Sequence, residues 1–312
     1  MIKKILITGG AGYIGSMLST YLVNQGHYVT VIDKLDYSKS SLNHLRFFEN
    51  FKLIAKDITS INILKKYLKG QDFIIPLAAL VGAPLCKKYP KKTVEINVTS
   101  IKNLLKLVKK NQKIIYLTTN SGYGIGDKNK FCDEDSELKP ISLYGQTKNQ
   151  AEKLVMSHKN FICYRLATVF GYSYRMRTDL LVNNFVLEAV NKNKIDLFEP
   201  LFRRNFIHIR DVVLAVIFSI KNFNILKNNI YNLGLSSANI TKLDLAKKIK
   251  KYIKGLSINV KSNQKDPDQR DYFVSNNKIE KKGFKAKILL GQGIQELISV
   301  YKTDPKKYNN NY

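Results

Sequence analysis

The feature that most constrains this chain is a short apolar run at residues 5–8, followed at once by a glycine-rich turn. Its β-branched residues predict a strand, and the apolar spacing over residues 17–23 predicts a helix directly after the turn. In such a unit Gly9 supports the tight turn, Gly12 lets the backbone approach a pyrophosphate, and Gly15 lets the helix pack on the strand. Free N–H groups at the helix N-terminus attract phosphates, so the pattern predicts a dinucleotide site. The alternative is that the glycines only pack a turn.

A second strand at residues 28–32 ends in Asp33, about twenty residues beyond the turn, where an acid accepts a hydrogen bond from the adenosine ribose. A carboxylate there repels a 2′-phosphate, so we predict NAD(H) in preference to NADP(H), although Lys34 next to it would soften that preference. The other cofactor-binding positions are expected in the first turn of the helix and at strand ends: Tyr13, Ile14, Asp57, Ile58, Leu77, Ala78, Ala79 and Thr118.

Alternating strand and helix patterns predict an α/β fold, a Rossmann doubly wound parallel sheet with a smaller C-terminal substrate-binding lobe. The expected strands are 5–8, 28–32, 51–55, 73–79, 113–119, 161–166 and 229–234, and the main helices 60–69, 93–110, 143–157 and 208–220. Within 93–110, Asn97 is expected to brace the neighbouring turns. The predicted domains are 1–171, to which 207–234 returns, and a lobe of 172–206 and 235–312. That lobe would be loop and short helices, with a polar loop at 261–270 and a frayed tail at 306–312.

The charge balance is strongly basic, with 52 Lys and Arg against 24 Asp and Glu, a formal net charge of +28. Most of the excess is lysine spread along the chain, whereas the arginines cluster at 175–177 and 203–210, so we expect a solvated lysine surface and no nucleic-acid partner. No apolar run approaches the roughly 18–20 residues of a membrane span. Three widely spaced cysteines, Cys86, Cys132 and Cys163, suggest a reduced, cytoplasmic protein with neither a disulfide framework nor a metal site.

Tyr144 and Lys148 stand four residues apart, on one face of the predicted helix 143–157. A phenol titrates near pH 10, and the Lys148 ammonium together with a positive nicotinamide ring would favour phenolate. The required pKa shift of about three units corresponds to roughly 4 kcal/mol. Lys148 can also hold the nicotinamide ribose. At the end of the strand 113–119, Thr119, and next Ser121, are candidates to align a sugar hydroxyl. The alternatives are a surface Tyr–Lys pair and strand-end capping.

These features resemble the extended short-chain dehydrogenase/reductases, specifically their NAD-dependent nucleotide-sugar epimerases and dehydratases, over residues 1 to about 300. The resemblance implies oxidation at the sugar C4 hydroxyl, with Tyr144 taking the proton and tightly bound NAD the hydride. It places an arginine of the segment 204–211 on the sugar-nucleotide diphosphate. This resemblance is strengthened by the segments 76–86, 119–126, 174–177 and 266–272. The residues expected to bind substrate are Val81, Asn120, Ser121, Arg175, Arg177, Arg204 and Arg270.

The same resemblance implies a GDP-linked sugar as substrate and a 2-oxo acid such as 2-oxoglutarate as the acceptor that restores the oxidised cofactor. It also implies a homodimer formed by the apolar stripes of the helices 93–110 and 143–157, the alternative being packing within the chain. The departures matter as well. The family's dehydratases carry Asp-Glu where Asn120 and Ser121 stand, and neither of these can act as that acid or base. Its 3,5-epimerases carry a cysteine at Ser121. The common Arg-Pro-Gly loop is replaced around 265–267, so Arg270 is expected to substitute.

Three alternatives remain open at the level of sequence. A 4-epimerase would use the same residues, with the keto sugar turning over before reduction. A non-catalytic NAD(H)-sensing regulator would need the glycine turn but not the set Thr119, Tyr144 and Lys148. A nucleic-acid binder would be revealed by salt-dependent retardation of DNA.

Overall fold

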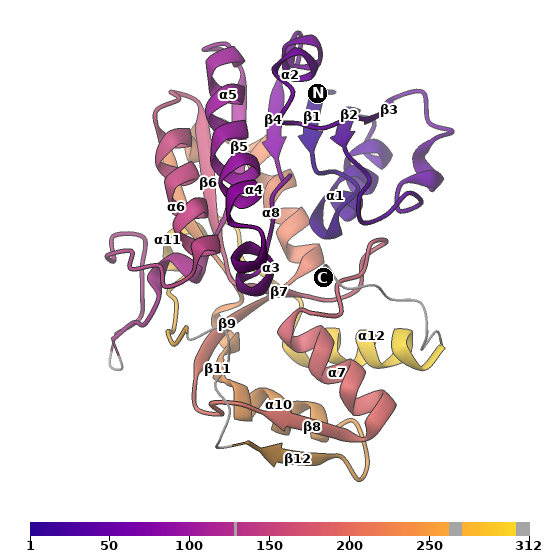
Figure 1. Ribbon diagram of the computed structural model, residues 1–312, viewed down its shortest axis with the longest axis vertical. Coiled ribbons are helices and arrows are strands. Elements are labelled where there is room, and N and C mark those ends of the chain that lie inside the picture. Colours follow the sequence, from indigo (N-terminus) through magenta and orange to yellow (C-terminus); the bar gives the residue numbers. More distant parts are fainter. Residues whose placement is uncertain (128–129, 262–269, 304–312) are drawn as a thin grey trace.

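The computed structural model describes residues 1–127, 130–261 and 270–303 (Figure 1). The tail predicted at 306–312, the replaced loop at 265–267 and most of the predicted polar loop therefore lie outside the described residues. A seven-stranded sheet, parallel at every pairing, forms the larger part. Its order across the sheet is β3 (Phe51–Ala55), β2 (Tyr28–Asp33), β1 (Lys4–Thr8), β4 (Phe73–Pro76), β5 (Lys113–Thr119), β6 (Phe161–Leu166) and β10 (Asn229–Leu233).

The strand order confirms the predicted doubly wound Rossmann fold. Chain order reverses between β1 and β4, and ligands of such sheets bind beyond the C-terminal strand ends at this point. Two sequence assignments need correction here. The strand expected over 73–79 ends at Pro76, and β10 ends at Leu233. In Figure 1 the arrows of β1, β2 and β4 point toward the smaller part of the molecule.

Helices cover both faces of the sheet, which explains why its strands are nearly all apolar. Ile5 and Ile7 of β1 face one helical layer, and Leu6 between them faces the other, because side chains alternate along a strand. The first layer holds α1 (Tyr13–Asn24) and α8 (Ile209–Lys221), with the short α9 (Phe223–Leu226) after it. The second holds α2 (Ile61–Leu68), α4 (Pro90–Val94), α5 (Ser100–Leu107) and α6 (Leu143–Met156).

The predicted helix 93–110 is interrupted by a π-helical turn at Glu95–Thr99, between α4 and α5. Asn97 lies in this turn, and its amide exchanges two hydrogen bonds with the backbone of Leu80, at 2.8 and 2.9 Å. The expected bracing role of Asn97 is therefore confirmed. It ties the helix to the loop between β4 and α3 (Ala83–Lys88), which borders the site.

The smaller part contains more β-structure than the sequence predicted. One three-stranded sheet has the order β11 (Asn239–Thr241), β9 (Arg203–His208), β7 (Thr168–Phe170), and a two-stranded sheet pairs β12 (Ser257–Val260) with β8 (Lys194–Leu197). Their helices are α7 (Leu181–Lys192), α10 (Lys242–Lys250) and α12 (Leu290–Thr303), whereas the short α11 (Asn277–Lys281) contacts β10 at the edge of the large sheet. The helix predicted from residue 208 starts at Ile209, because His208 ends β9 and its Nδ1 accepts from the Arg210 N–H at 3.2 Å.

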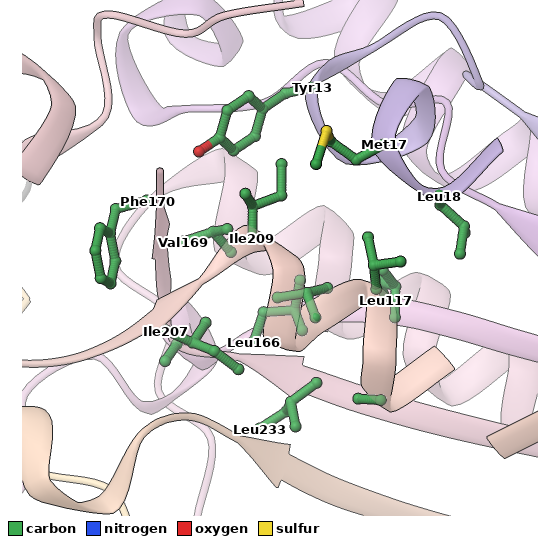
Figure 2. Close-up of a cluster of buried hydrophobic side chains, with 14 of the residues drawn as sticks. Tyr13, Met17, Leu18, Leu117, Leu166, Val169, Phe170, Ile207, Ile209 and Leu233 are labelled. Atoms are coloured by element: carbon green, nitrogen blue, oxygen red, sulfur yellow. The ribbon is translucent and has the colours of Figure 1, made fainter. Parts of the chain in front are cut away.

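The two parts share one apolar core at their junction. Figure 2 shows Tyr13 and Met17 of α1 gathered around Ile209 of α8 and Val169 of β7, with Ile207 beside them. The Tyr13 hydroxyl donates to the Gly171 carbonyl at 2.8 Å, immediately after β7. The first turn of α1 is thereby fixed to the loop that leads into the smaller part. In the part of the chain that the structure describes, no helix combines the length and the apolar character required to cross a bilayer.

Candidate active site

The glycine turn brings three backbone segments into close contact. Gly9 has φ +73°, and a Cβ on it would lie 2.5 Å from the Ala78 nitrogen. A Cβ on Gly15 would lie 2.4 Å from the Gly9 carbonyl oxygen, so these two positions exclude any side chain. Gly12, which precedes the first turn of α1, has only that oxygen nearby, at 3.2 Å, and its other side is open. This cradle at a helix N-terminus fits a dinucleotide pyrophosphate.

One pocket at the C-terminal strand ends collects every expected cofactor-binding position. Its lining includes Gly9, Gly12, Tyr13, Ile14, Asp33, Asp57, Ile58, Leu77, Ala78, Ala79, Thr118, Tyr144 and Lys148. The carboxylate of Asp33 accepts hydrogen bonds from the backbone N–H of Ala11 at 2.9 Å and of Leu35 at 2.7 Å. Burial raises the pKa of Asp33, and these two hydrogen bonds oppose the effect. Lys34 pairs with Asp57 at 3.4 Å.

Lys148 points from α6 onto the sheet. Its Nζ donates to the hydroxyl of Tyr116 at 2.7 Å and lies 4.2 Å from the centre of that ring. Burial lowers the pKa of Lys148 to about 7. Sequence reasoning missed Tyr116, which strand alternation could have found, because it places Tyr116 on the face of β5 that α6 covers.

Burial raises the pKa of Tyr144, and the charges of Arg177 and Arg270 and a hydrogen bond with Thr119 oppose it. Desolvation is the largest influence on the pKa of Tyr144, and Arg177 and Arg270 oppose it. That Lys148 together with a bound nicotinamide ring favours the phenolate stays a prediction.

Thr119, Ser121 and Arg270 form a connected polar group beside Tyr144. The Thr119 and Ser121 hydroxyls lie 2.8 Å apart, and the Arg270 guanidinium donates a hydrogen bond to Ser121 Oγ. Thr119 also accepts from the Ser121 N–H at 3.1 Å, so it caps the strand end as the alternative reading proposed. Both roles of Thr119 are compatible, because its hydroxyl has one donor and two acceptor positions.

A second pocket adjoins the first, and the two share Thr118, Tyr144 and Arg177 among their lining residues. Of the expected substrate-binding residues, Val81, Ser121, Arg177, Arg204 and Arg270 line the second pocket. Arg204 is 2% exposed, and its Nη1 donates to the Arg203 carbonyl at 2.9 Å. Arg177 forms an ion pair with Asp179.

Two of the expected substrate-binding residues lie elsewhere. Asn120 is 1% exposed and lines neither pocket, since the turn after β5 directs it into the protein interior. Arg175 lines the first pocket, next to Tyr37, and not the second. Arg175 and Arg177 lie two residues apart in the loop after β7, yet only Arg177 lines the second pocket. Their closeness in the sequence could not reveal this difference.

A parallel sheet with this glycine cradle, an acid ending β2 and a Tyr–Lys pair on α6 defines a class, the Rossmann-fold oxidoreductases that use a dinucleotide. The family model described as "NAD dependent epimerase/dehydratase family" matches residues 5–234, and the chain belongs to that family. NAD is therefore its cofactor.

Curated relatives and solved structures agree with this assignment. The chain is 32% identical to dTDP-D-glucose 4,6-dehydratase of Dictyostelium discoideum over 80% of its own length, and the match spans 62% of that enzyme. It is 31% identical to Protein CapI of Staphylococcus aureus over 68% of each chain. The structure of UDP-glucuronic acid 4-epimerase from Bacillus cereus, in complex with UDP-glucuronic acid and NAD, superposes with a TM-score of 0.85 at 25% identity, covering 96% of this chain and 99% of that one.

Proposed function

We propose that this protein oxidises the C4 hydroxyl of a nucleotide-linked sugar to the 4-keto sugar and does not eliminate water. The observation that carries the proposal is the set of groups around Tyr144. Among the described residues that line the second pocket, Asp179 is the one carboxylate, and it is paired with Arg177. Asn120 is buried away from the pocket, and the Ser121 hydroxyl is bonded to Thr119 and Arg270. The described residues that line this pocket therefore offer no acid–base pair for elimination.

In the proposed reaction, the Thr119 hydroxyl aligns the sugar C4–OH and Tyr144 Oη takes its proton. NAD, when bound, supplies the hydride acceptor. Lys148 holds the nicotinamide ribose and supplies a positive charge near Tyr144. To do so, it exchanges its hydrogen bond with Tyr116 for one to the cofactor. Arg177 and Arg270 favour the phenolate form of Tyr144 that accepts this proton, in agreement with their lowering effect on its pKa. We also propose that NAD remains tightly bound between turnovers.

The substrate proposed is GDP-D-glycero-α-D-manno-heptose, in the biosynthesis of a surface polysaccharide. The support is the likeness of the segments 76–86, 119–126, 174–177 and 266–272 to a GDP-heptose 4-dehydrogenase. Arg177, Arg204 and Arg270, from the lobe formed by 172–206 and 235–312, are the proposed contacts of the diphosphate and sugar, because guanidinium groups bind phosphate oxygens in pairs. Three buried free cysteines support a reduced, cytoplasmic setting.

A nucleotide-sugar 4-epimerase is the second candidate. It would use Thr119, Tyr144 and Lys148 in the same way and return the hydride to the other face of the keto sugar. The likeness to the B. cereus 4-epimerase structure favours it, at 25% identity. The same catalytic group serves both reactions, and the difference is whether the keto sugar can turn within the pocket.

The test is to mix the enzyme with GDP-heptose and 2-oxoglutarate, the proposed hydride acceptor, and to follow the sugar by NMR in deuterated water. We expect a 4-keto sugar to accumulate, with 2-oxoglutarate reduced in equal amount. Inversion at C4 without a ketone would favour the epimerase. Formation of a 6-deoxy sugar would contradict the argument from Asn120 and Ser121. Parallel reactions with UDP-linked sugars test which nucleotide base the enzyme accepts.

A further inference from the structure

Arg175 is a buried cation whose hydrogen bonds are incomplete. The residue is 5% exposed, and its Nη2 has no hydrogen-bond partner in the part of the chain that the structure describes. Its guanidinium carbon lies 5.0 Å from the centre of the Tyr37 ring, a cation–π contact. Because a buried N–H donor without an acceptor destabilises the folded protein, such a group marks a place where an acceptor arrives.

The surroundings of Arg175 identify the acceptor. The guanidinium lines the same pocket as Gly9, Gly12 and Asp33. Burial, followed by repulsion from Arg177, lowers the pKa of Arg175, and Asp33 is among the charges that oppose this. The two oxygens of Asp33 already accept from backbone N–H groups. An acceptor brought by the dinucleotide is therefore the group that fits, and the strong anions of a dinucleotide are its phosphates.

We propose that Arg175 binds a phosphate group of the dinucleotide in the cofactor pocket. The loop that carries it is fastened to the glycine turn. Ser173 Oγ donates to the Tyr13 carbonyl at 2.6 Å and lies 3.0 Å from Ser16 Oγ, in the first turn of α1. The helix N-terminus and the guanidinium therefore line one pocket on segments that are bonded to each other, and both favour phosphate.

The inference rests on NAD as cofactor but not on the identity of the sugar. It is tested by binding alone, so its failure is separate from failure of the proposed reaction. The variants are Arg175→Met, which keeps a long side chain over Tyr37, and Arg175→Lys, which keeps the charge. Arg46→Met removes an exposed cation and controls for the loss of one positive charge from a chain of net charge +28. Calorimetry with nucleotide-free protein measures NAD, NADP and adenosine, which lacks phosphate.

We expect Arg175→Met to weaken NAD binding by at least tenfold, Arg175→Lys to weaken it less, and Arg46→Met to change it by less than about twofold. Adenosine should bind all of the proteins alike. Equal losses for NAD and NADP support the proposal and assign the contact to the pyrophosphate. A loss confined to NADP would overturn it, because the contact would then be to a 2′-phosphate that NAD lacks. Unchanged affinity for both dinucleotides in Arg175→Met, or an equal loss for adenosine, would overturn it. If Arg175→Met does not fold, Arg175→Gln replaces it.

Discussion

Tyr144 is the residue on which the proposed chemistry depends most directly. Tyr144→Phe removes one hydroxyl that acts in the transition state and leaves the ring in place. We expect turnover to fall below about a hundredth of the wild-type value, while the affinity for NAD changes by less than about threefold. Steady-state kinetics and calorimetry measure the two quantities.

A matched control for this variant is Tyr28→Phe, on an exposed ring of β2. It should leave turnover unchanged. If Tyr144→Phe keeps more than about a tenth of wild-type turnover, Tyr144 is not the base.

The lowered pKa of Lys148 has a consequence for stability. Burial lowers it from 10.5 to about 7, so between these pH values the unfolded chain binds a proton that the folded protein lacks. The free energy of unfolding should therefore rise with pH through this window. Lys148→Met removes the group. Without added cofactor, we expect this variant to be more stable than wild type near pH 6–7, by up to about 4 kcal/mol, with the difference shrinking toward pH 10.

Urea denaturation at several pH values measures this effect. Lys153→Met, at an exposed position of the same helix, should show no pH-dependent difference from wild type. A difference for Lys148→Met that stays constant with pH would mean that the Lys148 ammonium is not destabilised by burial.

Asp33 leads us to expect at least a tenfold preference for NAD over NADP, about 1.4 kcal/mol. Its carboxylate lies in the cofactor pocket, where a 2′-phosphate would be repelled. Calorimetric titration of the wild-type protein with both dinucleotides measures the preference. Equal affinities for the two dinucleotides would contradict the role of Asp33 in selecting NAD, and would mean that Lys34 and Arg175 balance its charge.

At the scale of elements, local patterns were sufficient to predict the large sheet and insufficient for the smaller part. The strands β1 to β6 are apolar runs separated by amphipathic helices, so each can be recognised within a window of a dozen residues. The strands β8, β11 and β12 have only three or four residues, and they pair with distant segments, as Ser257 does with Lys194. Their existence depends on tertiary contacts that no local pattern contains.

The same division holds for the site. Residues that follow directly from strand ends, such as Asp33 and Ala78, were predicted because the topology of a doubly wound sheet fixes where strand ends lie. Arg175 and Asn120 were misplaced, because the direction of their side chains depends on how a loop folds. The loop that carries Arg175 is held through Gly171 and Ser173 by Tyr13 and Ser16, more than a hundred residues earlier in the chain.

A buried ion pair joins β6 to α6, the helix that carries Tyr144 and Lys148. Arg165 of β6 and Glu152 of α6 are 5% and 2% exposed, with Nη2 and Oε1 2.8 Å apart, and Arg165 also donates to the Tyr123 hydroxyl. Removing one partner leaves the other charge buried. We expect Glu152→Ala to lower the free energy of unfolding by about 3–5 kcal/mol.

The matched control is Glu188→Ala on α7, which breaks a pair with Lys192 at 2.8 Å that is largely open to solvent. Its expected cost is below about 0.5 kcal/mol. Urea denaturation compares both with wild type. Equal effects of the two substitutions would show that the buried pair contributes no more than a surface one.

On the scale of the whole molecule, the chain crosses between its two parts several times. It leaves the large sheet after β6, returns through α8 and β10, and ends with α12 against the smaller part. Glu296 of α12 accepts from the Tyr172 N–H at 3.0 Å and lies 3.2 Å from His208 Nε2, which ties the last helix to the segment after β7 and to the end of β9.

The homodimer remains a prediction, but the apolar side chains from which it was predicted cannot form the interface. Ile101 and Leu104 of α5, and Ala151 and Val155 of α6, are buried within the chain, so the apolar stripes used for the prediction are already covered. The apolar side chains still exposed on α4 and α6 include Val94 and Met156, at 41% and 46%. A dimer through these helices must therefore use the rims of α4 and α6.

We expect light scattering at micromolar concentration and about 0.15 M salt to give twice the mass of one chain. Because each protomer carries a net charge of +28, the dimer should weaken at low salt, where repulsion is less screened. Met156→Glu should shift the mass toward the monomer. Leu214→Glu, at a residue 41% exposed on α8 across the sheet, should not. A wild-type monomer at both salt concentrations would refute the dimer, and a dimer that Met156→Glu leaves intact would place its interface away from α6.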